Sequence, residues 1–178
     1  MFIHSANQLL YLAGSPQRGV DLGILGIISN GCVMVRVGEI SAVCTSPALM
    51  AKYPDEPQVD TSGKIVMPGF VDPHTHALWV GDRSAEFEMR IQGKSYLEIL
   101  SAGGGILSTV GATRQASVEQ MIAETRPRLE AMFTHGTTTA EVKSGYGLET
   151  LSELRMLDAI MTLDEEGPLE LVSTFLGA

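Results

Sequence analysis

The chain has 178 residues, of which 44% are hydrophobic and 19% charged, a composition typical of a soluble globular protein with a sizeable core. Its formal net charge of -9 argues against nucleic acid or an anionic membrane as the main partner, because both recruit clustered Lys and Arg. We expect neither a secretory signal nor a membrane span, because no basic and apolar leader and no long apolar run occurs. Cys32 and Cys44 form no Cys-x-x-Cys pair, so we expect reduced core thiols and a cytoplasmic protein.

Residues 1–66 have the pattern of a small β domain. The apolar runs 33–37 and 40–43 flank Gly38-Glu39 and predict a hairpin around a two-residue turn. The stretch 45–63 is rich in Pro, Asp and Ser, and we predict that it is loop.

After Pro68 the pattern changes to alternating strands and helices. Strands are predicted at 70–76, 137–142 and 169–175, and helices at 86–100 with an interruption at Gly93, from 118 to Gly136, and at 150–163. This order is typical of parallel βαβ units, either in an open doubly wound sheet or in the opening of a (β/α)8 barrel.

Capping boxes mark the starts of two of these helices. Ser117 to Gln120 and Thr150 to Glu153 each place a hydroxyl three residues before a Gln or Glu, the pattern in which side chains satisfy the first free N–H groups. Pro127 is expected to kink the first of these helices or to begin a new turn there.

The histidine pair His74-Thr75-His76 is the clearest chemical feature. On a strand, residues i and i+2 point to the same face, so both imidazoles can reach one metal ion, and neutral imidazole suits zinc or iron. Asp72 has the same parity, and it is either a carboxylate that orients the ligands or a structural one. Without its context, the motif would equally describe two unrelated strand-end histidines.

Two glycine-containing segments do not fit nucleotide-binding patterns. Gly103–Gly105 follows a predicted helix instead of a strand, and Gly93–Ser95 has Glu88 where a P-loop requires its first glycine. We interpret Gly103–Gly105 as a flexible loop near a pocket mouth. His135 lies at a predicted helix end and is either a favourable C-terminal cation or a simple surface residue.

Several of these segments resemble known proteins. The string from Met67 to His76 resembles the first-strand signature of the amidohydrolase superfamily, in which the histidine pair ligates the catalytic metal. The segments that are similar, in the same order, to those of imidazolonepropionases are Gly81–Glu88, Ala102–Val110, Glu141–Leu148 and Thr174–Ala178. The first 60 or so residues are generic for the superfamily.

The resemblance implies an α/β fold and a set of site residues. The N-terminal part of a composite, small β-sandwich-like domain, over 1–66, would precede the first strands and helices of a TIM-like (β/α)8 barrel over 67–178, truncated after about three of its eight strands. His74 and His76 would bind one divalent or trivalent metal ion, zinc or iron. Arg83 and Tyr146 would bind the substrate, Arg83 by holding a carboxylate. Lys143 is not expected to match the carbamylated lysine of some relatives, which belongs to a later strand.

The implied activity is hydrolysis of the cyclic amide of 4-imidazolone-5-propanoate to N-formimidoyl-L-glutamate in histidine degradation, by a homodimer. The other metal ligands and the general acid/base would lie beyond Ala178, so we expect the 178-residue chain alone to be inactive. Two alternatives remain. One is another amidohydrolase, such as a cyclic-imidate hydrolase or a purine or pyrimidine deaminase, and the other is a non-catalytic metal-binding or interaction module.

Overall fold

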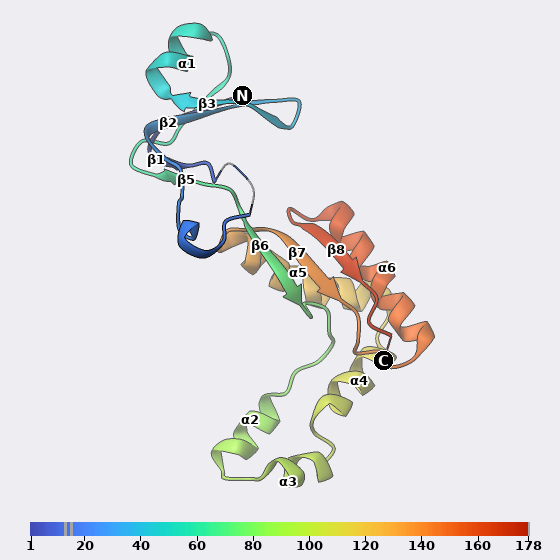
Figure 1. The fold of residues 1–178 in the computed structure, drawn as a ribbon. Helices are drawn as coiled ribbons and strands as arrows, with labels where there is room; N and C mark the ends of the chain where they lie inside the picture. Colours follow the sequence, from blue (N-terminus) through green and yellow to red (C-terminus); the bar gives the residue numbers. More distant parts are fainter. Residues whose placement is uncertain (13, 15, 178) are drawn as a thin grey trace. The chain divides into compact units, whose positions relative to one another are not determined.

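A computed structural model describes residues 1–12, 14 and 16–177 of the chain (Figure 1). The chain divides into two compact units, Met1–Pro68 and Gly69–Ala178. Each unit has its own sheet and its own buried apolar side chains, and each is described by itself.

The first unit is one mixed sheet with a short helix. Its elements are β1 (Phe2–Leu10), a 3-10 turn (Gly19–Asp21), β2 (Ile27–Arg36), β3 (Glu39–Thr45), α1 (Ser46–Lys52), β4 (Gln58–Asp60) and β5 (Ile65–Val66). The strand order is β3-β2-β1-β4, with β5 also paired to β1. Phe2, Met34 and Leu49 of α1 are buried together, so a helix covers part of one face. The described residues of this unit form a single sheet, whereas the sequence predicted the N-terminal part of a sandwich-like domain.

The predicted hairpin is present, but its turn lies one residue earlier than expected. Arg36 pairs with Glu39, which leaves Val37 and Gly38 at the turn. Both have positive φ, 52° and 79°. The tight turns that match strand twist require this conformation, and glycine adopts it without steric cost at the second position.

The predicted loop at 45–63 is wrong in part, because it contains α1 and β4. Pro47 lies at the start of α1, where a missing N–H costs nothing, and Ala, Leu, Met and Lys follow as good helix formers. The β4 strand pairs with β1 in parallel, from Phe2 opposite Gln58 to His4 opposite Asp60. A strand of three residues without alternation carries no pattern of its own, so its pairing with β1 decides its conformation.

The second unit is a parallel sheet with helices. Its elements are β6 (Phe70–Thr75), α2 (Ser84–Ile91), α3 (Tyr96–Ser101), α4 (Ile106–Gln115), α5 (Val118–Thr134), β7 (Thr137–Lys143), α6 (Thr150–Glu166) and β8 (Glu170–Thr174). The order β6-β7-β8 places β7 in the centre, parallel to both neighbours. The predicted parallel βαβ arrangement is confirmed, and the described residues form no closed barrel.

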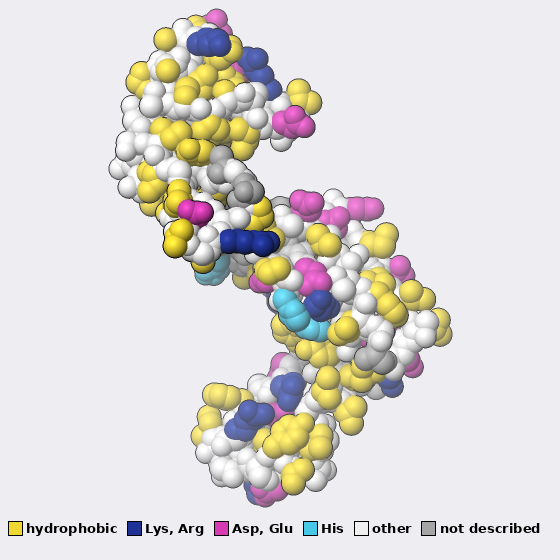
Figure 2. Space-filling model, viewed as in Figure 1, with side chains coloured by type: hydrophobic (Ala, Val, Ile, Leu, Met, Phe, Trp, Pro, Cys, Tyr) yellow, Lys and Arg dark blue, Asp and Glu magenta, His cyan; other side chains and the backbone are white. Residues whose placement is uncertain are grey.

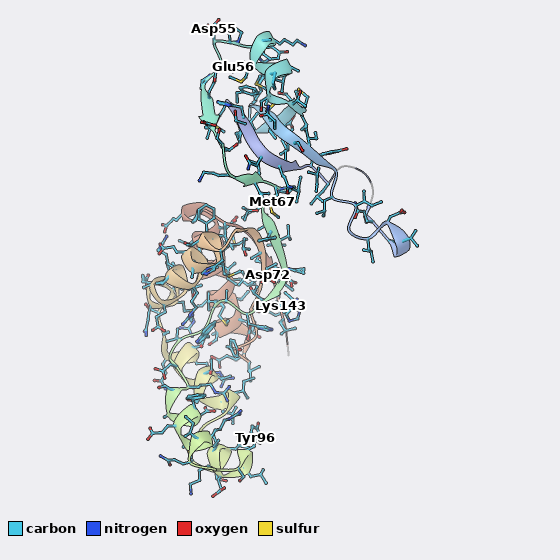
Figure 3. The ribbon with its side chains drawn as sticks, turned by 90° about the vertical axis from the view of Figure 1, so that its left-hand side faces the viewer. Asp55, Glu56, Met67, Asp72, Tyr96 and Lys143 are labelled. Carbon is cyan, nitrogen blue, oxygen red and sulfur yellow. The ribbon has the colours of Figure 1, made fainter. Side chains whose placement is uncertain are left out.

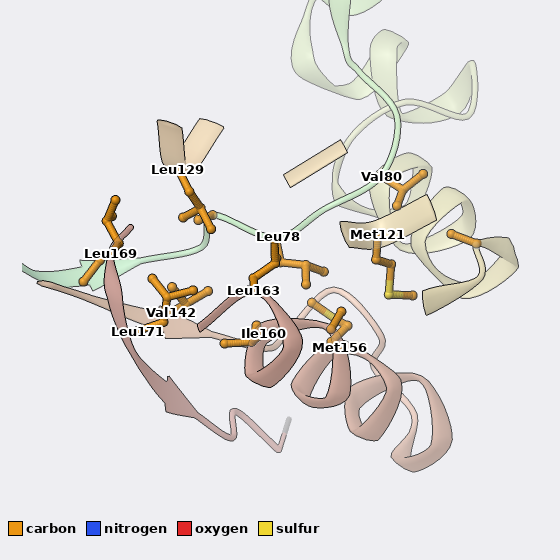
Figure 4. Packing of buried hydrophobic residues seen from close by; sticks show 14 residues of the cluster. Leu78, Val80, Met121, Leu129, Val142, Met156, Ile160, Leu163, Leu169 and Leu171 are labelled. Atoms are coloured by element: carbon orange, nitrogen blue, oxygen red, sulfur yellow. The ribbon is translucent and has the colours of Figure 1, made fainter. Parts of the chain in front are cut away.

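The core of this unit lies between the sheet and helices α5 and α6 (Figure 4). Within β7, Ala140 and Val142 are almost completely buried against the helices, whereas Glu141 and Lys143 alternate with them on the opposite face. Met156, Ile160 and Leu163 follow at helical spacing on α6, and each is at most 1% exposed. The sheet therefore presents a polar face away from its helices.

The predicted helices are mostly confirmed, with two differences. The hydroxyl of Ser117 accepts a hydrogen bond from Gln120 N–H and caps α5, as expected. At α6 the residue before the helix is Glu149, and the expected capping box at Thr150 does not form. The helix α4 was not predicted, because three glycines precede it and Ser, Thr and Gly111 within it are weak helix formers.

Candidate active site

The predicted site residues meet at the carboxyl edge of the parallel sheet. Strands β6, β7 and β8 end at Thr75, Lys143 and Thr174, and parallel strands end at the same edge. His74 and His76 lie at the end of β6, and Figure 3 labels Asp72 on this strand and Lys143 on β7. Active sites of (β/α)8 barrels lie at this edge of their sheets.

The two histidine rings lie side by side. Their centroids are 5.7 Å apart, His74 is exposed, and His76 is half-buried. The ladder between β6 and β7 is irregular between Asp72 and Thr75, where Pro73 has no N–H to donate. The carboxylate of Asp72 accepts a hydrogen bond from the backbone N–H of His74 at 3.2 Å, so its contact is with the backbone and not with an imidazole.

The ring of His76 has an unsatisfied nitrogen. Its Nδ1 is buried and has no hydrogen-bond partner among the described residues. Buried polar atoms in proteins are almost always paired, so an orphaned imidazole nitrogen next to a second imidazole fits a metal-ligating role. No group of three or more His, Cys, Asp or Glu side chains that could hold one metal occurs within residues 1–12, 14 and 16–177. Two imidazoles alone would be fewer ligands than a protein metal site ordinarily uses.

An ion pair lies on the same polar face of the sheet. Lys143 Nζ is 2.5 Å from Glu141 Oε1, and the hydroxyl of Thr174 donates to the same oxygen at 2.7 Å. The Lys143 ammonium, and after it the Thr174 hydroxyl, hold the pKa of Glu141 below its usual range. Figure 2 shows histidine side chains beside basic and acidic ones over these strands. Lys143 is thus already paired with a carboxylate, and the sequence analysis did not single out Glu141.

Arg83 and Tyr146 line one pocket although the chain separates them widely. The pocket has a volume of about 320 Å³ and is lined by Trp79, Asp82, Arg83, Thr109 and Tyr146. Of these, Trp79, Asp82 and Thr109 were not predicted. Trp79 and Asp82 lie in the segment that connects β6 with α2, and Thr109 is a buried residue of α4, a helix without a sequence signal.

Tyr146 also reaches the histidine pair. Its ring centroid is 5.7 Å from that of His76. Gly145, directly before it, has a φ of +127°, and a Cβ at that position would lie 3.7 Å from the His76 ring and 3.0 Å from Leu176. A glycine therefore allows the backbone to pass close to His76 in a conformation that other residues rarely adopt.

The segment after Tyr146 is held from two sides. The buried Glu153 accepts hydrogen bonds at Oε1 from the N–H groups of Gly147 (2.7 Å) and Leu148 (2.8 Å). The guanidinium of Arg114 donates to the carbonyl oxygens of the same two residues, at 2.5 and 2.9 Å. Glu153 was predicted to cap α6; instead its side chain fixes the loop that carries Tyr146.

Known proteins match the chain closely in sequence. It is 51% identical to the imidazolonepropionase of Herpetosiphon aurantiacus over 92% of this chain and 38% of that protein. It is 49% identical to the imidazolonepropionase of Halobacterium salinarum over 99% of this chain and 42% of that protein. The chain is a homologue of the imidazolonepropionases. It spans about two fifths of the length of these relatives.

Solved structures share the fold of this imidazolonepropionase homologue at low sequence identity. Guanine deaminase of E. coli matches with a TM-score of 0.65 and 18% identity, over 97% of this chain and 36% of that chain. Atrazine chlorohydrolase TrzN from Arthrobacter aurescens, complexed with zinc, matches with a TM-score of 0.61 and 13% identity, over 98% and 35%. No protein-family model matches the chain. None of the helices in the described part of the chain has the length and apolar composition needed to cross a membrane.

Proposed function

We propose that this chain supplies the histidine pair and the substrate-anchoring residues of an imidazolonepropionase, which opens the ring of 4-imidazolone-5-propanoate to give N-formimidoyl-L-glutamate. One observation carries the proposal: Arg83 and Tyr146 line one pocket, and the Tyr146 ring lies 5.7 Å from that of His76. A carboxylate-binding group and a candidate metal ligand are thereby within reach of one small molecule. The unit from Gly69 onward would correspond to the opening third of a (β/α)8 barrel, and the first unit to part of a small β domain.

Arg83 is suited to hold the propanoate group. A planar guanidinium presents parallel N–H donors that match both oxygens of a carboxylate, which gives orientation as well as binding. Tyr146 adds a phenolic O–H that can donate to the substrate or accept from it. Two contacts of this kind hold a small ring in one orientation, and a fixed orientation is a large part of the rate enhancement in such reactions.

His74 and His76 would hold zinc or iron, the metals that neutral imidazoles suit. When bound, such an ion supplies a nucleophile near neutral pH and polarises a carbonyl group. The unpaired Nδ1 of His76 and the adjacent ring of His74 support this assignment. Carbon–nitrogen bond cleavage also needs a group that delivers a proton to the leaving ring nitrogen. We expect that group, and the other metal ligands, from the part of imidazolonepropionases that this chain does not span.

The proposal is tested with Arg83→Met in an active protein that contains these residues. Loss of a bidentate charged contact should lower kcat/KM for imidazolone propanoate by about 100-fold, because such a contact is worth roughly 1.5–3 kcal/mol. The product is identified by mass spectrometry as the substrate plus one water. Arg126→Met is the matched control, since Arg126 forms an exposed pair with Glu166 on the helical side.

A second substrate separates this function from other ring hydrolases. If Arg83 binds the propanoate, Arg83→Met should not change the rate on an imidazolone that lacks the carboxylate. Equal losses on both compounds would contradict the role of Arg83, and higher wild-type activity on purine or pyrimidine rings would favour a deaminase. Metal content is measured in parallel: His76→Ala should lose zinc or iron, whereas His135→Ala, at the exposed end of α5, should retain it.

The 178-residue chain alone is expected to be inactive, because it supplies two candidate metal ligands and no identified proton donor. Turnover of imidazolone propanoate by the purified 178-residue chain would contradict this expectation. By homology we also propose that the whole enzyme is a cytoplasmic homodimer.

A further inference from the structure

Glu86 is buried next to the proposed substrate anchor. It lies in the first turn of α2 and is 8% exposed, although its neighbours on that helix are largely exposed. Its Oε1 accepts from Arg83 Nε at 2.9 Å, and its Oε2 accepts from Arg83 Nη2 at 2.6 Å. Oε1 also accepts from the backbone N–H of Gly105 at 2.7 Å. Both carboxylate oxygens are therefore engaged.

The pairing leaves a defined part of the guanidinium free. An arginine side chain has five N–H donors, and the edge formed by Nε and Nη2 faces Glu86. The remaining edge, formed by Nη1 and the second N–H of Nη2, presents two parallel donors of the kind that bind a carboxylate bidentately. The Nε–Nη2 edge of the Arg83 guanidinium binds the Glu86 carboxylate, and the Nη1–Nη2 edge is available to bind a second carboxylate.

Each residue of Gly103–Gly105 is required by this arrangement. Gly103 and Gly105 have φ of +86° and +81°, values that side-chain-bearing residues rarely adopt. A Cβ on Gly104 would lie 3.0 Å from the Glu86 carboxyl carbon and 2.8 Å from Cγ2 of Ile99. The loop thus passes directly against the carboxyl group of Glu86. The flexible pocket-mouth loop expected from the sequence is instead tied to Glu86 through Gly105.

We propose that Glu86 is a positioning residue that orients Arg83 for the substrate carboxylate and links it to the Gly103–Gly105 loop. The inference rests on the proposed function, because it assigns the partner of Arg83 in that same pocket. The loop leads directly into α4, whose Thr109 lines the pocket with Arg83 and Tyr146. Glu86 therefore links Arg83, directly before α2, to the glycine loop that leads into α4.

The kinetic test compares Glu86→Gln, Glu86→Asp and Gly104→Ala in an active protein that contains these residues. Glu86→Gln places an amide N–H against the Arg83 fork, and Gly104→Ala displaces the carboxyl group; both should raise KM for imidazolone propanoate at least tenfold. We expect kcat to change less than threefold, because the anchor binds ground state and transition state alike. Glu86→Asp should recover part of the affinity. A fall in kcat with unchanged KM would overturn the proposal.

Two matched controls separate positioning from general damage. Glu88→Gln removes an exposed carboxylate of the same helix, whose contact is with Gln92. Gly111→Ala adds a methyl group to α4 at a position where, apart from its chain neighbours and the adjacent backbone of α4, no described atom lies within 4 Å of the new Cβ. Both should leave KM and kcat unchanged. A rise in KM in either control that equals the rise in the Glu86 and Gly104 variants would overturn the proposal.

Hydrogen exchange tests the same contact in the 178-residue chain, without any need for activity. The Gly105 amide should be protected in the wild-type chain and in Glu88→Gln, and should exchange at least tenfold faster in Glu86→Ala, which removes the acceptor oxygen. Unchanged protection would refute the Glu86 contact whatever the enzyme does. Lost protection together with no turnover of imidazolone propanoate by the active protein would instead refute the proposed function and leave the positioning contact standing.

Discussion

Replacing Glu153 with Ala should destabilise the second unit strongly, because this residue is 3% exposed and its Oε1 accepts two backbone N–H groups. Removing the acceptor leaves the donors of Gly147 and Leu148 unpaired, and a buried unpaired donor costs about 1–3 kcal/mol. Gly147 is buried, whereas Leu148 is half-exposed and can gain a water molecule. The expected loss in unfolding free energy is therefore about 2–4 kcal/mol.

Glu153→Gln separates the hydrogen bonds from the charge. Its amide oxygen can still accept from both N–H groups, so a loss of only about 1 kcal/mol is expected. The Oε2 position is buried without a partner among the described residues, and a Gln N–H₂ group placed there would find no acceptor. The order of stability should therefore be wild type, then Gln, then Ala.

Urea unfolding followed by tryptophan fluorescence measures this loss. Trp79 is the single tryptophan and lies in the second unit, so the signal reports on that unit. With a denaturant dependence of about 2 kcal/mol per molar urea, the midpoint should fall by about 1–2 M in Glu153→Ala. Glu165→Ala, at an exposed position of the same helix, is the control and should change stability by at most about 0.5 kcal/mol. If Glu153→Ala shifts the midpoint no more than this control, the two hydrogen bonds do not hold the Tyr146 loop.

Three further outcomes are expected. Leu163→Ala, at a core position that is 1% exposed, should lower the unfolding free energy by about 2–5 kcal/mol, and a loss below 1 kcal/mol would mean that α6 does not pack as described. The Lys143 ammonium lowers the pKa of Glu141 in the folded state, so the unfolded chain binds a proton at Glu141 more readily. The contribution of Glu141 to stability should be complete above about pH 4.5 and should fall as the pH drops through the lowered pKa. A urea midpoint of unfolding that does not change between about pH 3 and pH 6 would contradict this. Cys32 and Cys44 are both free thiols; burial raises the pKa of the Cys32 thiol to about 11, whereas Cys44 is partly exposed. Iodoacetamide at about pH 8 should therefore modify Cys44 first, and peptide mass mapping would identify the modified cysteine.

The sequence was most informative where a local pattern matches the element that forms. The apolar spacing of α5 and α6 and the β-branched run of β7 agree with the structure, because each buries one face against the others. The patterns of α1 and α4 were missed. α1 is short and lies in a segment of loop-like composition, and α4 contains weak helix formers that are held by tertiary contacts such as the bond from Val80 N–H to the Thr113 hydroxyl.

The candidate site likewise has a part that local sequence predicts and a part that depends on tertiary packing. The proximity of His74 and His76 follows from local sequence, because one residue separates them at the end of a strand. The two rings stay near each other even where the β6 ladder is irregular. Arg83 and Tyr146 were selected by resemblance, and their sharing of one pocket depends on how α2 and the segment after β7 pack. Their separation in the sequence does not predict that Arg83 and Tyr146 share a pocket.

The residues that hold those side chains came only from the three-dimensional arrangement. In the sequence, Glu86 is an ordinary charged residue of a predicted helix, and Glu153 is part of a predicted capping box. Both are buried: Glu86 accepts from Gly105 N–H in a loop beyond α3, and Glu153 accepts from Gly147 N–H in the loop directly before its own helix. A buried carboxylate needs hydrogen-bond donors, and a linear pattern does not show which backbone N–H groups the folded chain brings to it. Local sequence pattern thus decided β7, α5, α6 and the spacing of the histidine pair, whereas tertiary packing decided α4, β4 and which side chains orient Arg83 and Tyr146.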